Sequence, residues 1–204
     1  MSNRVVIVNH GLCNLNSIAR ALEECGGNVV VTDDPGDLND ADRIVLPGVG
    51  AFAAAMANLH AKGLDEAICE NVVRRSVPLL GICLGMQLLA ESSTEGGDCR
   101  GLGLLSGAVV KFESQRGERI PHMGWNAVES TGLTTLFDGI PSNTDFYFVH
   151  SYHLSCPDAT VAARTNYCGG FVSAVAQGSV VAVQFHPEKS QKAGFRLLQN
   201  FLAL

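Results

Sequence analysis

The 204-residue sequence predicts an α/β fold: a parallel sheet with helices on both faces and a partly antiparallel extension. In the first half, short apolar, β-branched runs alternate with segments of helical spacing. In the second half, strand-like runs separated by Gly, Pro, Asn and Ser follow one another. Hydrophobic residues make up 47% of the chain, which at this length suffices for a sizeable buried core.

The elements are expected in the following order. Residues 4–9 (RVVIVN) have the continuous apolar character of a buried strand, and residues 14–25 have helical spacing that Gly26 and Gly27 end. Further strands are expected at 28–32, 43–46 and 78–82, and further helices at 51–61, 64–74 and 84–92. The second half is expected to hold strands at 102–112, 126–129, 146–150, 161–165, 170–176 and 180–185, and a closing helix at 190–202.

Composition narrows the possible functions. The sequence contains no internal repeat, low-complexity tract or linker, so we expect a single domain over residues 1–204. The net charge is −6 and no Lys/Arg cluster occurs, which argues against a nucleic-acid partner. No apolar stretch approaches the roughly 18 residues of a membrane span. The seven cysteines form no CxxC pair, which predicts a reducing, cytoplasmic compartment without disulfides or structural zinc.

Gly81-Ile82-Cys83-Leu84-Gly85 is the strongest chemical signal. It lies where a predicted strand turns directly into a helix, which is the pattern of a nucleophile elbow. The glycines permit a tight turn that presents the sulfur at the carboxyl edge of the sheet, and the helix N-terminus favours the thiolate. The alternative is that Cys83 is a small buried hydrophobe, as many free cysteines are.

A nucleophilic cysteine needs a base, and the base needs an orienting group. Gln184-Phe185-His186-Pro187-Glu188 follows a predicted strand. In an extended chain His186 and Glu188 would point to the same side, so Glu188 can orient the imidazole. The alternative is a surface His-Pro-Glu turn.

Two further segments are candidates for binding. Pro47-Gly48-Val49-Gly50 follows the third predicted strand and can offer a backbone N–H to an oxyanion, with the amide of Leu84 as the second donor. An ordinary strand-to-helix connection is the alternative, and the Walker pattern is absent. His150 and His153 resemble a metal pair only weakly, because on a strand they would point to opposite faces, so we expect no metal.

Taken together, these residues make the chain similar to the class I glutamine amidotransferases, which use a Cys-His-Glu triad. The family motifs are GICLGMQLL (81–89), PGVG (47–50) and QFHPE (184–188). Within that family the chain most resembles the glutaminase subunits of imidazole glycerol phosphate synthase, through PHMGWN (121–126), FYFVHSY (146–152) and HPEKS (186–190). The resemblance covers the chain from Arg4 to Leu204 and implies a three-layer α/β/α, flavodoxin-like fold.

The resemblance also implies a role for each matched residue. Cys83 would attack the glutamine carboxamide, His186 would move protons, and Glu188 would orient His186. The amides of Val49 and Leu84 would form the oxyanion hole, after a peptide flip in the PGVG strand. No cofactor is implied. Glutamine would be held by Gly50, Gln87, Glu95, Ser151 and Tyr152.

The resemblance further implies a partner. Ammonia released from glutamine would pass to a separate (β/α)8 cyclase subunit, which completes imidazole formation in histidine biosynthesis. Trp125 and Lys189 would face that cyclase in a heterodimer, and the liganded cyclase would activate the glutaminase. A buried aromatic and a solvated lysine are the alternatives for these two residues.

The first loop departs from the family pattern D-x-G-x-G-N-L-x-S. Asn9 replaces the acid and Cys13 replaces a glycine, which would strain the turn if position 13 required a positive φ. In the family this loop lies near the partner face. An alternative therefore stays open: the chain is a paralogous subunit that feeds a different synthase, such as one of cell-surface sugar biosynthesis. The complete triad counts against a silent regulatory module, and the subunit-specific motifs count against a cysteine peptidase or γ-glutamyl hydrolase.

Overall fold

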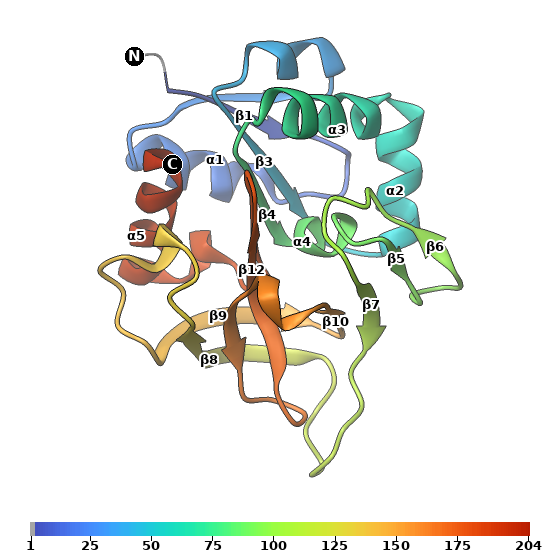
Figure 1. Ribbon diagram of the computed structural model, residues 1–204, viewed down its shortest axis with the longest axis vertical. Helices are drawn as coiled ribbons and strands as arrows, with labels where there is room; N and C mark the ends of the chain where they lie inside the picture. Colours follow the sequence, from blue (N-terminus) through green and yellow to red (C-terminus); the bar gives the residue numbers. More distant parts are fainter. Residues whose placement is uncertain (1–2) are drawn as a thin grey trace.

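A nine-stranded mixed sheet between two layers of helices forms the centre of the computed structural model, which describes residues 3–204 (Figure 1). The strand order is β2-β1-β3-β4-β13-β12-β11-β8-β9; the first five strands run parallel, and the last four are antiparallel to their neighbours. The large-sheet strands are β1 (Arg4–Val8), β2 (Asn28–Thr32), β3 (Arg43–Gly48), β4 (Leu79–Cys83), β8 (His122–Ser130), β9 (Thr144–His150), β11 (Val161–Thr165), β12 (Phe171–Gln177) and β13 (Val180–Val183).

The helices cover both faces of the parallel strands because side chains alternate along each strand. Val5 and Ile7 of β1 pack with one helix pair, and Val6 and Val8 pack with the other. Figure 1 shows α1 and α5 together on one side and α2 and α3 together on the other. The helices are α1 (Leu15–Glu24), α2 (Phe52–Ala61), α3 (Leu64–Arg75), α4 (Leu84–Leu88) and α5 (Gln191–Ala203).

A second, four-stranded sheet was not predicted from the sequence. Its order is β10-β7-β5-β6, and two of its strands have only two residues each, too short for a periodic pattern. Short 3₁₀ turns complete the chain. The elements are β5 (Ser92–Ser93), β6 (Cys99–Arg100), β7 (Ala108–Lys111), β10 (Tyr152–Ser155), η1 (Pro35–Asp40), η2 (Thr135–Phe137), η3 (Asp158–Thr160) and η4 (Pro187–Lys189).

Two expected elements are shorter than predicted. The strand expected at 102–112 is reduced to β7 because Gly103 and Gly107 adopt φ values of 66° and 120°, which interrupt an extended chain. The helix expected at 84–92 ends at Leu88, whose carbonyl accepts the N–H of Leu102 from a returning segment. The α/β fold itself, with its antiparallel extension, is confirmed.

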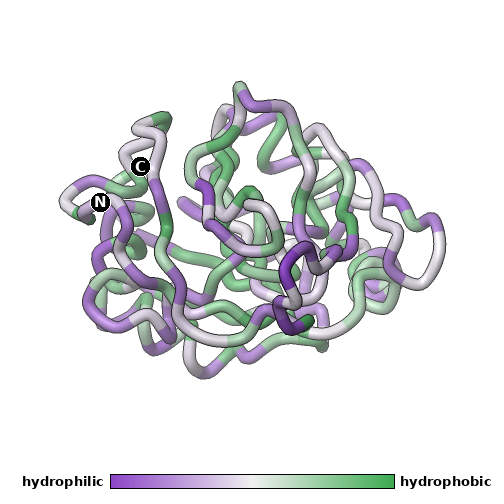
Figure 2. The backbone as a smooth tube through the Cα atoms, turned by 90° about the horizontal axis from the view of Figure 1, so that it is seen from below, coloured by the Kyte–Doolittle hydropathy of each residue, from purple (hydrophilic) through white to green (hydrophobic). Residues whose placement is uncertain are grey.

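Hydropathy follows this layering. Figure 2 shows apolar stretches of the chain running through the interior, while hydrophilic residues mark outer turns and the ends of elements. Between residues 3 and 204, no helix has both the length and the apolar character needed to cross a membrane.

Candidate active site

The predicted catalytic residues meet at the carboxyl edge of the parallel strands. Gly48 at the end of β3 is paired with Cys83 at the end of β4, and Val183 of β13 is paired with Ile82. His186 follows β13 by three residues. Open α/β sheets bind ligands at this edge, because the strand ends leave a crevice between the connecting loops.

Cys83 occupies a strained elbow, as the sequence predicts. Its φ is +55° and its ψ is −111°, and it precedes the first turn of α4. The two motif glycines are required by close contacts: a Cβ on Gly85 would lie 1.7 Å from the carbonyl oxygen of Leu46, and one on Gly81 would lie 3.0 Å from the backbone of Met86. Any larger residue at position 85 would push α4 away from β3 and displace the sulfur.

His186 and Glu188 form a buried pair. Nδ1 of His186 lies 2.9 Å from Oε1 of Glu188, and each side chain is only 4% exposed. The chain is not extended at this point, because residues 187–189 form η4; the turn, and not strand alternation, brings the carboxylate onto the imidazole. The backbone of His186 is also held, since its N–H donates to the carbonyl of Tyr147 and its carbonyl accepts from the hydroxyl of Ser190.

The surroundings of His186 favour its charged form. Burial by itself lowers the pKa of a histidine, but the hydrogen bonds and charges of Cys83 and Glu188 outweigh burial and raise the pKa of His186 to about 10. Nε2 is buried beside the Cys83 sulfur, close enough for this effect but outside the geometry of a formed hydrogen bond. His186 is therefore an imidazolium at neutral pH, and it lies next to the Cys83 sulfur.

A cavity of about 350 Å³ opens on the other side of Cys83. It contains every residue for which the sequence predicts glutamine binding, together with Cys83 and both expected oxyanion donors. His186 and Glu188 do not line it; they lie behind Cys83 with Pro47, Gly48 and Val49. The cavity is lined by Val49, Gly50, Cys83, Leu84, Gln87, Glu95, Val149, His150, Ser151 and Tyr152.

Two of the expected glutamine-binding side chains are already fixed. Nε2 of Gln87 donates both to the carbonyl of Tyr152 (2.9 Å) and to Oε1 of Gln184 (3.0 Å). Oε2 of Glu95 accepts the N–H of Phe52 at the start of α2. Since both hydrogens of the Gln87 amide are used, only its oxygen is free to meet a ligand.

The two expected oxyanion donors differ in their present state. Leu84 is the first residue of α4, so no carbonyl of its own helix accepts its N–H. The N–H of Val49 instead donates to the carbonyl of Leu12 over 2.8 Å. One donor is therefore ready, and the other is engaged with the first loop.

Comparison with known proteins agrees with this geometry. The family model described as "Glutamine amidotransferase class-I" matches residues 6–204. The chain belongs to the class I glutamine amidotransferase family. It is 46% identical over 200 residues to the imidazole glycerol phosphate synthase subunit HisH 1 of Campylobacter jejuni, covering 98% of this chain and 100% of the relative. It is 50% identical to the HisH subunit of Moorella thermoacetica, covering 97% and 93%.

Solved structures support the fold alone. PurLQS from Thermotoga maritima superposes with a TM-score of 0.75 at 22% identity, covering 100% of this chain and 99% of that chain. A structure described as a glutamine amidotransferase superposes with a TM-score of 0.77 at 19% identity, covering 98% and 99%. The predicted amidotransferase fold is thus confirmed.

The unusual first loop of this amidotransferase is not strained at Cys13. Gly11 carries the positive φ of 91°, and Cys13 does not have one. Asn9 replaces the acid of the family pattern and keeps its acceptor, because Oδ1 takes the N–H of Gly11 over 3.1 Å. Burial raises the pKa of the Cys13 thiol to about 11, so Cys13 stays protonated at neutral pH.

Two further histidines, His122 and His150, form an ordered hydrogen-bonded chain. Nδ1 of His150 lies 2.8 Å from the carbonyl oxygen of Tyr152, which can only accept a hydrogen bond, so Nδ1 is the protonated nitrogen. Nε2 of His150 therefore accepts from Nδ1 of His122 (3.0 Å), whose Nε2 accepts from the Asn126 amide (3.2 Å). His153 stacks on Phe112 instead. Residues 3–204 contain no group of three potential ligands.

Trp125 and Lys189 lie in one exposed patch, joined by Tyr147, for which the sequence predicts no role. The Trp125 ring is 6.0 Å from the Tyr147 ring, and Nζ of Lys189 lies 5.8 Å from its centre. Trp125 is 48% exposed and neighbouring Met123 is 63% exposed. The carbonyl of Tyr147 accepts a hydrogen bond from the N–H of His186, so a single backbone hydrogen bond connects this patch to the catalytic triad.

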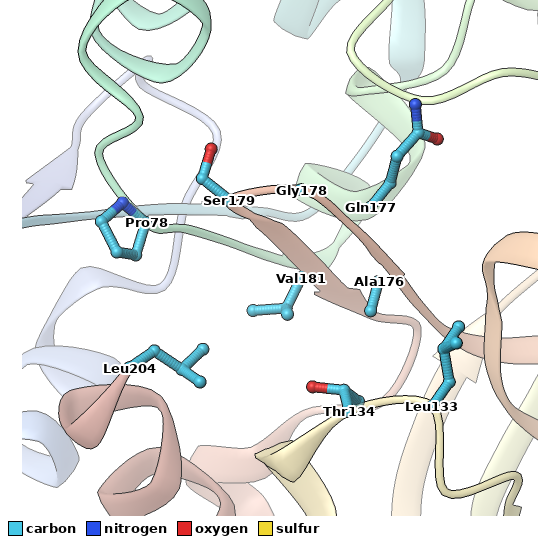
Figure 3. Close-up of a pocket in the computed structure, with 9 residues that line it drawn as sticks. All are labelled: Pro78, Leu133, Thr134, Ala176, Gln177, Gly178, Ser179, Val181 and Leu204. Atoms are coloured by element: carbon cyan, nitrogen blue, oxygen red, sulfur yellow. The ribbon is translucent and has the colours of Figure 1, made fainter.

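A second cavity, of about 470 Å³, lies at the opposite end of β13 (Figure 3). Leu204, Leu133, Val181 and Ala176 surround it, with Gln177 pointing away at the rim. None of the side chains that line it is titratable, and it lies apart from Cys83.

Proposed function

We propose that this chain is the glutaminase subunit of an imidazole glycerol phosphate synthase, acting in the cytoplasm as one amidotransferase domain over residues 1–204. The observation that carries the proposal is that Cys83 lines a cavity of about 350 Å³ while the buried pair of His186 and Glu188 lies behind it. Near-full-length identity of 46–50% to subunits of that synthase supports the choice of pathway.

The first half of the reaction forms a thioester. Sγ of Cys83 attacks the carboxamide carbon of glutamine, and the C=O electron pair moves onto oxygen. The N–H of Leu84, joined by that of Val49 after it leaves Leu12, stabilises the resulting oxyanion. The C–N bond then breaks as His186 gives its Nε2 proton to the departing nitrogen, and ammonia leaves.

The second half releases glutamate. Neutral His186 takes a proton from water, whose oxygen attacks the thioester carbon. The C–S bond breaks, its electron pair returns to Cys83, and His186 is again the imidazolium. Throughout, Glu188 holds Nδ1 over 2.9 Å and stabilises the positive charge.

We further propose that the partner is a (β/α)8 cyclase that forms a heterodimer with this chain and receives the ammonia. The exposed patch of Met123, Trp125, Tyr147 and Lys189 supports an interface close to the triad. Aromatic residues surrounded by polar ones are typical of interface hot spots. Enclosed transfer would keep ammonia from being protonated and lost to water.

A partner-dependent assay tests this proposal. Glutamate release is measured for the chain alone, with the cyclase subunit, and with the cyclase plus its ribonucleotide ligand. Low activity alone and a large increase with the liganded cyclase are expected. Glutaminase activity that does not change when the cyclase is added would support the glutaminase chemistry but contradict the pathway. It would favour the second candidate, a subunit of a different synthase, which is suggested by the departures from the family pattern at Asn9 and Cys13.

A further inference from the structure

A buried amide contacts the nucleophile from the side opposite to solvent. Nε2 of Gln184 lies 3.8 Å from Sγ of Cys83, within hydrogen-bond range for sulfur. Gln184 is completely buried and follows β13 directly, and its N–H donates to the carbonyl of Ser173 over 2.9 Å. The backbone therefore holds this side chain against the elbow.

The direction of the contact follows from a chain of hydrogen bonds. The carbonyl oxygen of Tyr152 can only accept, so the Gln87 atom that faces it is the nitrogen. The second hydrogen of that nitrogen points at Gln184, which must present its oxygen there. The nitrogen of Gln184 consequently faces Cys83, and Gln184 is a donor to the sulfur and not an acceptor.

We infer that Gln184 is a further catalytic residue, whose side-chain amide donates a hydrogen bond to the Cys83 thiolate. The inference rests on the proposed role of Cys83 as nucleophile. The uncharged thiol can donate to the carbonyl of Val149, 3.9 Å away, whereas the thiolate has Gln184 as its donor, with the buried Nε2 of His186 nearby. Donors favour the charged form, because a hydrogen bond to an ion is stronger than one to a neutral group.

The same donor acts twice in the reaction. It stabilises the thiolate before the S–C bond forms. It meets the thiolate again when water attacks and the C–S bond breaks, because the electron pair then returns to sulfur. Gln184 does not line the glutamine cavity, but its oxygen accepts from Gln87, which does. A variant that keeps this acceptor is therefore expected to reduce the chemical steps and to leave glutamine binding largely intact.

Alkylation of Cys83 tests the inference without needing the partner. The full chain is treated with iodoacetamide across a pH range, and modification of the Cys83 peptide is followed by mass spectrometry. For Gln184→Met, which keeps length and removes the donor, we expect the midpoint to rise by about one pH unit, with labelling below it about tenfold slower. Gln184→Glu places a carboxylate beside the sulfur and should raise the midpoint further.

Ser173→Ala is the matched control. Ser173 is also completely buried and pairs with Gln184 through its backbone, but its hydroxyl has no hydrogen-bond partner within residues 3–204. We expect the control to keep the native labelling profile. In the assembled enzyme, Gln184→Glu, which keeps an acceptor for Gln87, should lower kcat at least about tenfold while KM for glutamine changes less than about twofold.

A native labelling profile in folded Gln184→Met would overturn the inference. If that variant does not fold, as judged by circular dichroism, Gln184→Glu decides in the same way. The outcome is separable from the proposed function, because retained glutaminase activity in Cys83→Ala would refute the nucleophile itself, whatever the labelling profiles of the Gln184 variants.

Discussion

The backbone N–H of Val49 donates to the carbonyl oxygen of Leu12 over 2.8 Å, which ties the first loop to the strand beside the glutamine cavity. His10 reinforces the connection, since its Nε2 lies 2.9 Å from the carbonyl of Pro47. In the proposed mechanism, an oxyanion formed at Cys83 accepts from the Val49 N–H. The proposed role therefore requires the hydrogen bond between Val49 and Leu12 to break, whereas the N–H of Leu84 has no acceptor within its own helix.

The state of Val49 can be followed by NMR. In the isolated chain, its amide should exchange slowly with solvent because Leu12 protects it. With the cyclase and glutamine bound to Cys83→Ala, the amide shift and its exchange rate should change as the bond to Leu12 breaks. The N–H of Asn9, which donates to Thr32 over 2.7 Å, is the internal control and should not change. An unaltered Val49 amide in an activated complex would remove it from the oxyanion hole.

The charge of His186 depends on Glu188. We expect Glu188→Gln to lower the pKa of His186 from its raised value of about 10, because the negative charge at Nδ1 is lost. Glutaminase activity should fall at least about tenfold, since the imidazolium is less stable during proton transfer. An NMR titration of His186 measures the shift directly, and an unchanged pKa would contradict the assignment of Glu188.

The same shift makes stability depend on pH. The folded-state pKa of His186 lies above the ordinary value of 6.5, so its stabilisation is complete below about pH 6.5 and is lost as pH rises toward about 10. Urea unfolding across this window should show a larger decrease for the native chain than for Glu188→Gln. An equal decrease in the free energy of unfolding of the native chain and of Glu188→Gln would mean that the pairing of His186 with Glu188 does not contribute to the pH dependence of stability.

The histidine chain predicts unusual tautomers. His122 and His150 should both carry their proton on Nδ1, because Tyr152 and His150 supply the successive acceptors. Burial lowers the pKa of His122 to about 4 and that of His150 to about 3, so neither should titrate near neutral pH. Nitrogen-15 spectra of the imidazole rings report the tautomer. A proton on Nε2 of His150 would contradict the chain.

Trp125 should matter for association and not for folding. Because Trp125 is 48% exposed, Trp125→Ala is expected to change the free energy of unfolding by less than about 0.5 kcal/mol. Loss of an aromatic hot spot should weaken cyclase binding by about 2 kcal/mol or more. Val73→Ala on α3, where the side chain is 67% exposed, is the matched control. Equal affinities for both variants would exclude this patch from the interface.

The core of the fold is predictable from sequence, whereas its periphery is not. Residues 28–32 and 161–165 form strands with the predicted bounds. The first contains three consecutive valines, and the second begins with Val161 and ends with Thr165, both β-branched residues that favour strands. The run 102–112 is also apolar, but it contains two glycines whose positive φ no hydropathy pattern reveals. Strands of two residues, such as 92–93 and 99–100, depend entirely on tertiary pairing.

The site shows the same division. The elbow at Cys83 is predictable because close backbone contacts require glycine at positions 81 and 85, and the two glycines are visible in the sequence. Gln184 was not selected, since its contact with Cys83 joins positions 101 residues apart. Val149 and His150 were missed as cavity residues for the same reason. The engagement of Val49 with Leu12 is likewise a tertiary property that the motif alone does not encode.

Glutamate release by Cys83→Ala, measured beside the native chain with the cyclase bound, tests the central claim most directly. Cys83 is buried at the floor of the cavity and its side chain is small, so the substitution leaves a folded protein that can be checked by circular dichroism. Because the nucleophile itself is removed, turnover should fall by at least about a thousandfold. Turnover within tenfold of the native rate would contradict catalysis through Cys83.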